Sequence, residues 1–177
     1  MTQGRPAPIL ETGRLRLRAW RREDFEPYHA IMREPAVHRF FGPEPMGREE
    51  LWRRMCASAG NWLMNGFGGL AVERLNDGKL VGNVGLFTAG RDFEPVFGDE
   101  PEMGWIFATE AHGTGMAFEA TQALLDWAEA SLSPQPIWAI ISEGNEPSFK
   151  LAARLGFKPL QTIDYHGPTM VLQRPSW

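Results

Sequence analysis

Gly113 and Gly115 stand where a helix is expected to begin. They lie in "AHGTGMAFEATQALLDWAEA" (111–130), just before an apolar stretch with helical spacing. Glycine destabilises a helix by about 1 kcal/mol relative to alanine, so its presence here needs a reason. The first N–H groups of a helix lack partners, and glycine lets an anion approach them without a Cβ in the way. The segment therefore indicates either a phosphate site or a simple chain turn.

Two common phosphate motifs are disfavoured by the residues present. A dinucleotide fingerprint, G-x-G-x-x-G, needs a third glycine at position 118, where Phe118 stands. The P-loop pattern G-x-x-x-x-G-K-[ST] does not occur in the sequence. A phosphate site at this turn would therefore belong to another class of protein.

Apolar periodicity and turn residues predict about seven strands and about four helices. The strands are expected at 13–20, 67–74, 79–89, 102–108, 136–142, 157–164 and 168–173, and the helices at 22–34, 48–66, 116–130 and 145–156. In the second helix the spacing predicts an inner stripe of Leu51, Met55, Ala59 and Leu63. Residues 1–10 are expected to form a loose leader, and 1–177 a single mixed α/β (α+β) domain.

Composition limits the class of protein further. The net charge of -4 gives no footprint for general nucleic-acid binding, and the sequence contains no apolar run long enough for a membrane span. The only cysteine, Cys56, excludes an intrachain disulfide and is expected to be buried filler in its helix. We expect a cytoplasmic protein that binds neither nucleic acid nor membrane, a monomer or homodimer. The four histidines show no metal-ligand spacing, so we expect no metal.

At this point the sequence resembles a known family. "EMGWIFATEAHGTGMAFEA" (102–120) followed by "NEPSFKLAARLGF" (145–157) resembles the Gcn5-related N-acetyltransferases (GNAT), closest to the branch of ribosomal-protein N-terminal acetyltransferases. The opening "LETGRLRLRAWRREDFEPYHAI" is similar to that branch too, so the resemblance spans roughly residues 9–174. It implies a mostly antiparallel sheet that splays between the fourth and fifth predicted strands, with acetyl-CoA in the cleft.

The resemblance also implies which residues hold acetyl-CoA. The family's phosphate motif, [Q/R]-x-x-G-x-[G/A], is matched by His112, Gly113, Thr114, Gly115, Met116 and Ala117, with histidine replacing Gln or Arg. The pyrophosphate would sit on the amides of 113–117. Pantetheine would pair with backbone near Ile106, Phe107 and Ala108 and contact Asn145, which is alternatively a plain helix cap.

Acetyl transfer to an amine needs a base, because a free alkyl amine has a pKa near ~10. Glu102 is the first candidate, on the strand that would line the cleft, with Glu100 and Asp99 as close substitutes. Many family members supply an acid from a tyrosine where this chain has Ala152, and the branch suggests Ser148 instead. An exposed strand-end glutamate and a helix first-turn serine are the plain structural alternatives.

The loop at 89–102 carries five acidic residues and two phenylalanines against a single arginine. Such a loop suits a cationic amine acceptor, although a solvated loop explains it equally well. A protein N-terminus, favoured by the branch, and a small cationic amine such as a polyamine or aminoglycoside both remain open. An inactive CoA-binding sensor or partner module is a further alternative, because Ala152 and His112 depart from the family pattern.

Overall fold

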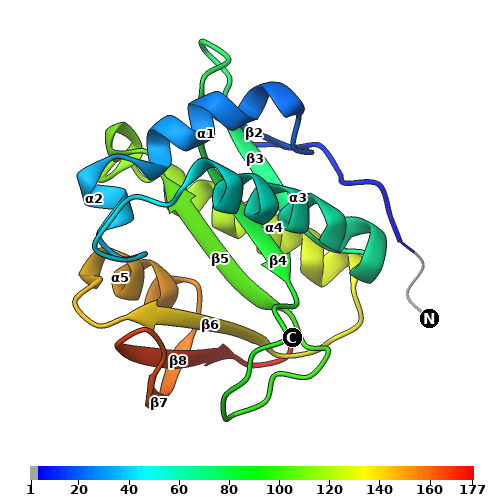
Figure 1. The fold of residues 1–177 in the computed structure, drawn as a ribbon. Coiled ribbons are helices and arrows are strands. Elements are labelled where there is room, and N and C mark those ends of the chain that lie inside the picture. The colour runs from blue at the N-terminus through cyan, green and yellow to red at the C-terminus, as the bar shows by residue number, and fades with distance from the viewer. Residues whose placement is uncertain (1–3) are drawn as a thin grey trace.

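The computed structural model describes residues 4–177; residues 1–3 of the expected leader lie outside the described range. The described chain forms one open sheet of eight strands in the order β1-β2-β3-β4-β5-β6-β8-β7 (Figure 1). The strands are β1 (Leu10–Glu11), β2 (Leu15–Arg18), β3 (Gly69–Arg74), β4 (Leu80–Phe87), β5 (Glu102–Phe107), β6 (Ile137–Ser142), β7 (Lys158–Asp164) and β8 (Pro168–Arg174). Every neighbouring pair is antiparallel except β5 and β6.

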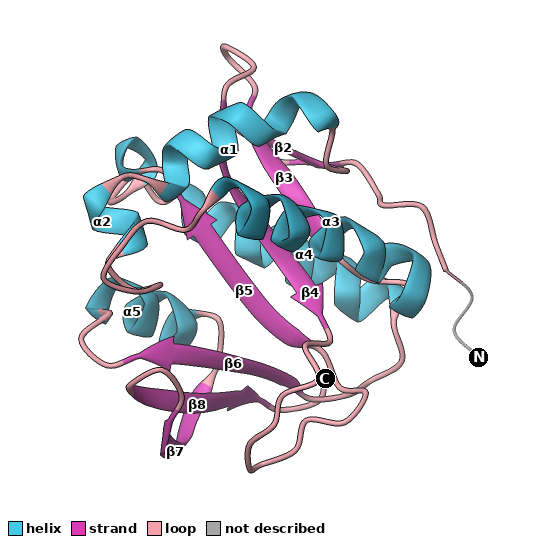
Figure 2. Ribbon diagram, viewed as in Figure 1, coloured by secondary structure: helices cyan, strands magenta, loops and turns pink. Residues whose placement is uncertain are grey.

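Helices cover both faces of this sheet. They are α1 (Phe25–Met32), α2 (Pro35–His38), α3 (Arg48–Asn65), α4 (Met116–Ser131) and α5 (Glu146–Arg154). One apolar cluster joins α1, α2 and α3 to Ile106 of β5, and a larger one joins α4 and α5 to Met103 and Phe107 of the same strand. Successive strand residues point to opposite faces, so β5 contributes to both cores. Figure 2 shows α1 and α3 in front of β4 and β5, with α4 behind them.

The sheet opens between β5 and β6, as expected from the family resemblance. The two strands pair in parallel at a single register position, Glu102 opposite Trp138. Beyond it β6 turns away together with β8 and β7, and the group lies at an angle to β5 in Figure 2. The peptide edge of β5 above Glu102 is therefore left without a neighbouring strand.

Two elements are additional to the sequence-based expectation. Strand β1 has two residues and helix α2 has four, which is too short for periodicity to be recognised. Leu10 of the expected loose leader is part of strand β1. The backbone N–H of Arg5 donates a hydrogen bond to the carbonyl oxygen of Trp62. Within residues 4–177, no helix is both long and apolar enough to cross a membrane.

Two expectations about α3 were wrong. Leu51 and Met55 are buried, but Leu63 is 76% exposed and the stripe ends in Trp62, whose indole N–H donates to the carbonyl of Gly69. Ala59 and Cys56 are exposed as well, so the cysteine is not core filler. A helical stripe drifts by about 20° per seven residues. In the last turn of α3 the large Trp62 side chain therefore packs against the sheet in place of Leu63.

Candidate functional site

A cavity of about 380 Å³ opens at the splay between β5 and β6. Its walls come from five parts of the chain: α2 with the loop that follows it, β5, the glycine turn, the start of α4, and α5. Among the sequence-predicted residues, its lining contains Ile106, Phe107, His112, Gly113, Gly115, Ala117, Asn145 and Ser148. Ala108, Thr114 and Met116 are chain neighbours of these residues without lining the cavity. The fold thus brings most of the predicted cofactor residues to one cleft.

The glycine turn presents unpaired backbone donors to this cleft. Gly113 and Gly115 have φ angles of +71° and +82°, which favour glycine before any ligand is considered. A Cβ at Gly113 would meet nothing within 4 Å, so the space above it is open. In the described chain, no residue accepts from the amides of Gly113, Gly115 or Ala117. The positive end of the α4 dipole lies at the same place, and unpaired amides at a helix start are the groups that can bind an anion.

The free edge of β5 supplies the next part of the cleft. The amide of Ala108 donates to Val81 on β4, while Trp138 on β6 donates to the carbonyl of Pro101. Because peptide groups alternate along a strand, the backbone of Trp105 and Phe107 points toward the splay. The Phe107 carbonyl oxygen lies 2.9 Å from His112 Nε2, and a carbonyl can only accept, so this ring nitrogen carries the proton. His112 therefore donates a hydrogen bond to the backbone at the free edge of β5.

Helix α5 places Ser148 beside β5. Asn145 caps the helix, since its Oδ1 accepts from the Ser148 backbone N–H at 3.3 Å. The Ser148 hydroxyl oxygen accepts from the Trp105 indole N–H at 3.2 Å. Because the indole can only donate, the hydroxyl proton of Ser148 stays available for another acceptor. Ala152, at the position where many family members have tyrosine, is fully buried.

The cleft is also lined by three basic side chains that were not predicted from the sequence. Arg39 follows α2, and Lys150 and Arg154 lie one turn apart on α5. The Arg154 guanidinium sits 3.9 Å from the centre of the Phe118 ring, in a cation–π contact. The i, i+4 spacing on the capped helix was a signal for the α5 pair. Arg39 comes from a turn-rich segment and reaches the cleft only through the fold.

Glu102 does not line this cavity; it lies at the closed end of the splay. It is 3% exposed, and its two carboxylate oxygens accept from Arg91 Nε and Nη2 at 2.8 and 2.7 Å. Arg91 also donates to the Tyr165 hydroxyl at 2.6 Å and lies 5.0 Å from that ring's centre. Burial lowers the pKa of the Arg91 guanidinium, but the hydrogen bonds and charge of Glu102 outweigh it and raise that pKa.

The acidic loop between β4 and β5 folds against the second half of the sheet. Glu100 accepts from the Trp138 indole N–H at 2.6 Å, and the Phe97 ring stacks on Trp138 with centroids 4.5 Å apart. Asp92 and Asp99 are exposed. Of the three acidic candidates for a base, Glu100 and Glu102 are therefore hydrogen-bonded and Asp99 faces solvent.

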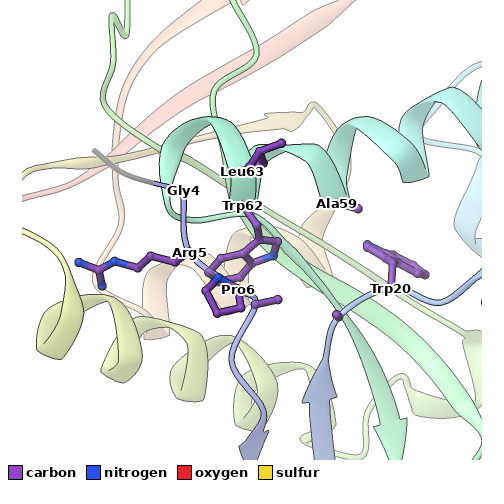
Figure 3. A pocket seen from close by; sticks show the side chains of 9 residues that line it. Gly4, Arg5, Pro6, Trp20, Ala59, Trp62 and Leu63 are labelled. Atoms are coloured by element: carbon purple, nitrogen blue, oxygen red, sulfur yellow. The ribbon is translucent and has the colours of Figure 1, made fainter. Parts of the chain in front are cut away.

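A second cavity, of about 370 Å³, lies between residues 4–7 and α3 (Figure 3). Trp20, Trp62, Ala59 and Leu63 line it together with the N-terminal segment, and Arg5 is its only titratable side chain. Arg5 is engaged with the Ser131 carbonyl oxygen. This cavity offers no group for proton transfer. Among residues 4–177, no three His, Cys, Asp or Glu side chains are grouped so that they could hold a metal ion.

Comparison with known proteins assigns the family. The model of the acetyltransferase (GNAT) domain matches residues 14–158, and the chain belongs to this family of acetyltransferases. A solved putative GNAT-family acetyltransferase from Bordetella pertussis is 32% identical, with a TM-score of 0.83 over 94% of this chain and 99% of that one. The uncharacterized N-acetyltransferase YoaA of Bacillus subtilis is 26% identical over 85% of this chain and 83% of its own length.

A ribosomal-protein acetyltransferase is among the structural neighbours. A putative ribosomal-protein-serine acetyltransferase from Vibrio cholerae is 22% identical and has a TM-score of 0.74, over 95% of this chain and 97% of that one. The likeness at that identity shows a shared fold. GNAT acetyltransferases use acetyl-CoA.

Proposed function

We propose that the protein transfers the acetyl group of acetyl-CoA to a primary amine by direct attack, and that the acceptor is a protein N-terminus. One observation carries the proposal: the cleft joins the unpaired amides of the glycine turn to the open backbone edge of β5. A pyrophosphate fits the amides at one end, and the amides of a pantetheine arm fit the strand edge. Arg39, Lys150 and Arg154 add positive charge for the phosphates.

Protonation of the leaving thiolate is assigned to the hydroxyl group of Ser148. When the amine nitrogen bonds to the thioester carbon, the C–S bond breaks and the sulfur needs a proton; a thiol has a pKa near ~8.5. The Trp105 indole occupies a lone pair of the Ser148 oxygen, so the hydroxyl proton is free to be donated to the sulfur. Ser148 would regain its proton from solvent. This arrangement supports a serine acid in place of the family's tyrosine.

Glu102 is assigned as the base that removes the amine proton. Arg91 uses one lone pair on each of its oxygens, and a carboxylate has about four such sites. A proton can therefore reach Glu102, directly or through water, without loss of the Arg91 pair. Glu100 is the weaker candidate, because it is hydrogen-bonded to Trp138 on the other strand of the splay.

The acceptor assignment rests on the resemblance to the ribosomal-protein branch and on the acidic side chains exposed beside the closed end of the splay. A small cationic amine such as a polyamine or aminoglycoside is the second candidate for the same reason of charge. For the compartment and the assembly we propose a cytoplasmic protein, monomeric or homodimeric, in which the described residues form a single GNAT domain.

The test is an acceptor screen read by mass spectrometry with acetyl-CoA as donor. Peptides with free N-termini, spermidine and kanamycin are compared, each with wild type and with Glu102→Gln. We expect transfer to a peptide α-amine, and a loss of turnover in Glu102→Gln with acetyl-CoA binding retained. Binding of acetyl-CoA without transfer to any amine would favour the sensor alternative instead.

A further inference from the structure

Arg14, the residue before β2, reaches the glycine turn 100 positions further along the chain. Its Nη1 donates to the carbonyl oxygen of Thr114 at 2.9 Å, and a Cβ built on Gly115 would lie 3.5 Å from its Nη2. Arg14 is not one of the residues that line the cleft, so it contacts the turn from outside. An arginine outside the cleft therefore holds the backbone at which the pyrophosphate is proposed to bind.

Glu119, in the first turns of α4, fixes the Arg14 guanidinium in place. Its Oε2 accepts from Arg14 Nε and Nη2, each at 2.7 Å. Its Oε1 accepts from the Arg14 backbone N–H at 2.9 Å and from the Thr12 hydroxyl at 2.6 Å. Burial raises the pKa of the Glu119 carboxyl, but the hydrogen bonds from Thr12 and Arg14 outweigh it and lower that pKa. The ionised carboxylate thus gives Arg14 a defined position beside the turn.

The peptide between Thr114 and Gly115 has two orientations to choose from. Glycine adopts positive and negative φ about equally well, so this peptide can turn over at little cost. In a trans peptide the C=O and N–H point in opposite directions. Because the Thr114 carbonyl faces Arg14, the Gly115 N–H faces the other way, and Gly115 lines the cleft. Among residues 4–177 this N–H has no acceptor, so it is free to donate to an anion.

We propose that Arg14 is a positioning residue for acetyl-CoA: held by Glu119, it fixes the peptide so that the Gly115 N–H donates to the pyrophosphate. The proposal rests on the proposed function and adds to it two residues that do not line the cleft. A hydrogen bond on a carbonyl also polarises its peptide, which strengthens the N–H as a donor. Arg14 and Glu119 together carry no net charge, so their effect on binding comes from orientation rather than from long-range attraction.

The first test compares acetyl-CoA with S-acetylpantetheine, which has the same thioester arm and no pyrophosphate, by calorimetry. Loss of a hydrogen bond to a charged group weakens binding about tenfold, so Arg14→Met should raise the Kd for acetyl-CoA by that factor and leave the Kd for S-acetylpantetheine unchanged. The matched control is Arg16→Met, because Arg16 pairs with Glu11 and Glu73 instead, and neither Kd should change. Equal weakening of both ligands in Arg14→Met would mean general damage to the cleft and would overturn the proposal.

Glu119→Met separates orientation from charge by the sign of its effect. If charge alone acted on the pyrophosphate, removal of a nearby carboxylate would tighten acetyl-CoA binding. If Glu119 acts by holding Arg14, its loss releases the guanidinium and the Thr114–Gly115 peptide, and binding weakens several-fold even though a negative charge is gone. Tighter or unchanged binding of acetyl-CoA by Glu119→Met would contradict the proposal.

The backbone amide signal of Gly115 in ¹⁵N NMR reads the peptide directly, without ligand or acceptor. Arg14→Met should move this signal and Arg16→Met should leave it in place. An unmoved Gly115 signal in Arg14→Met would refute the proposal even if the wild type transfers acetyl groups. A moved signal together with weaker acetyl-CoA binding in Arg14→Met, but no transfer to any amine by the wild type, would contradict the proposed function alone. No binding of acetyl-CoA by the wild type would overturn both.

Discussion

The pair formed by Arg91 and Glu102 makes a quantitative prediction about stability. Glu102 is 3% exposed and its two oxygens are held by one guanidinium at 2.7 and 2.8 Å. Replacement by Arg91→Met keeps much of the side-chain volume but leaves a buried carboxylate without its partner. Loss of one member of a buried ion pair costs about 3–5 kcal/mol, whereas the pair as a whole stabilises a fold far less.

The expected shift in melting temperature follows from chain length. For a domain of this size, 1 kcal/mol corresponds to about 2–4 °C, so Arg91→Met should lower Tm by roughly 6–20 °C. The control is Arg53→Met, because Arg53 pairs with Glu49 on the exposed face of α3. Exposed pairs contribute little, and this variant should change Tm by about 2 °C or less.

A double variant tests the cause. Arg91→Met combined with Glu102→Gln removes both charges, so it should be more stable than Arg91→Met alone. The assay is calorimetric or fluorescence-detected unfolding of the four proteins at neutral pH. If Arg91→Met changes Tm no more than Arg53→Met does, the buried pair does not form and the reasoning fails. A double variant less stable than Arg91→Met would show that the loss is not due to an unpaired charge.

Three further predictions concern acetyl-CoA binding in the cleft, the stability of the core, and stability at low pH. Arg154→Gln removes a cation that lines the cleft, so the Kd for acetyl-CoA should rise about tenfold and depend less on salt; calorimetry at two ionic strengths checks this, and an unchanged Kd would contradict it. Trp62→Phe removes a buried indole N–H that bonds a strand carbonyl at 2.9 Å, so the free energy of unfolding in urea should fall by about 1–3 kcal/mol; an unchanged midpoint would argue against that bond. The hydrogen bond from Arg74 lowers the pKa of Asp77 to about 2, so its contribution is present above about pH 4 and is lost as the pH falls toward 2. The free energy of unfolding should therefore change less with pH across that range in Asp77→Asn than in wild type. An equal change in the two proteins would refute this assignment.

Local signals in the sequence were sufficient to predict the segments that meet in the cleft. The glycine turn, the strand before it and the capped helix at 145–156 are contiguous segments, and each has a pattern that depends on its own residues. Their meeting in one cleft followed from the family resemblance, since nothing in a single strand or helix shows that β5 and β6 part. The positive φ angles at both glycines leave the turn explanation valid as well, because the same conformation serves either purpose.

The parts that the sequence did not predict depend on contacts between distant segments. Arg91 appeared as one basic residue in an acidic loop, and its pairing with Glu102 and Tyr165 joins residues 11 and 74 positions away. Helix α2 was missed because four residues give no periodic pattern. The prediction placed Leu63 on the inner stripe, whereas Trp62 is the buried residue and Leu63 is exposed. An ideal helical repeat does not take into account the size of the side chain that packs against the sheet.

The most direct test of the account is a calorimetric titration of acetyl-CoA into wild type, Gly113→Asn and Gly113→Asp. Asparagine and aspartate both tolerate a positive φ, and the space above Gly113 is open, so the two variants should fold alike and differ by one charge. If the pyrophosphate lies on this turn, wild type binds acetyl-CoA, Gly113→Asn binds it several-fold more weakly, and Gly113→Asp loses at least a further tenfold. Equal affinity of the two variants, or no binding by the wild type, would contradict the assignment of the cleft.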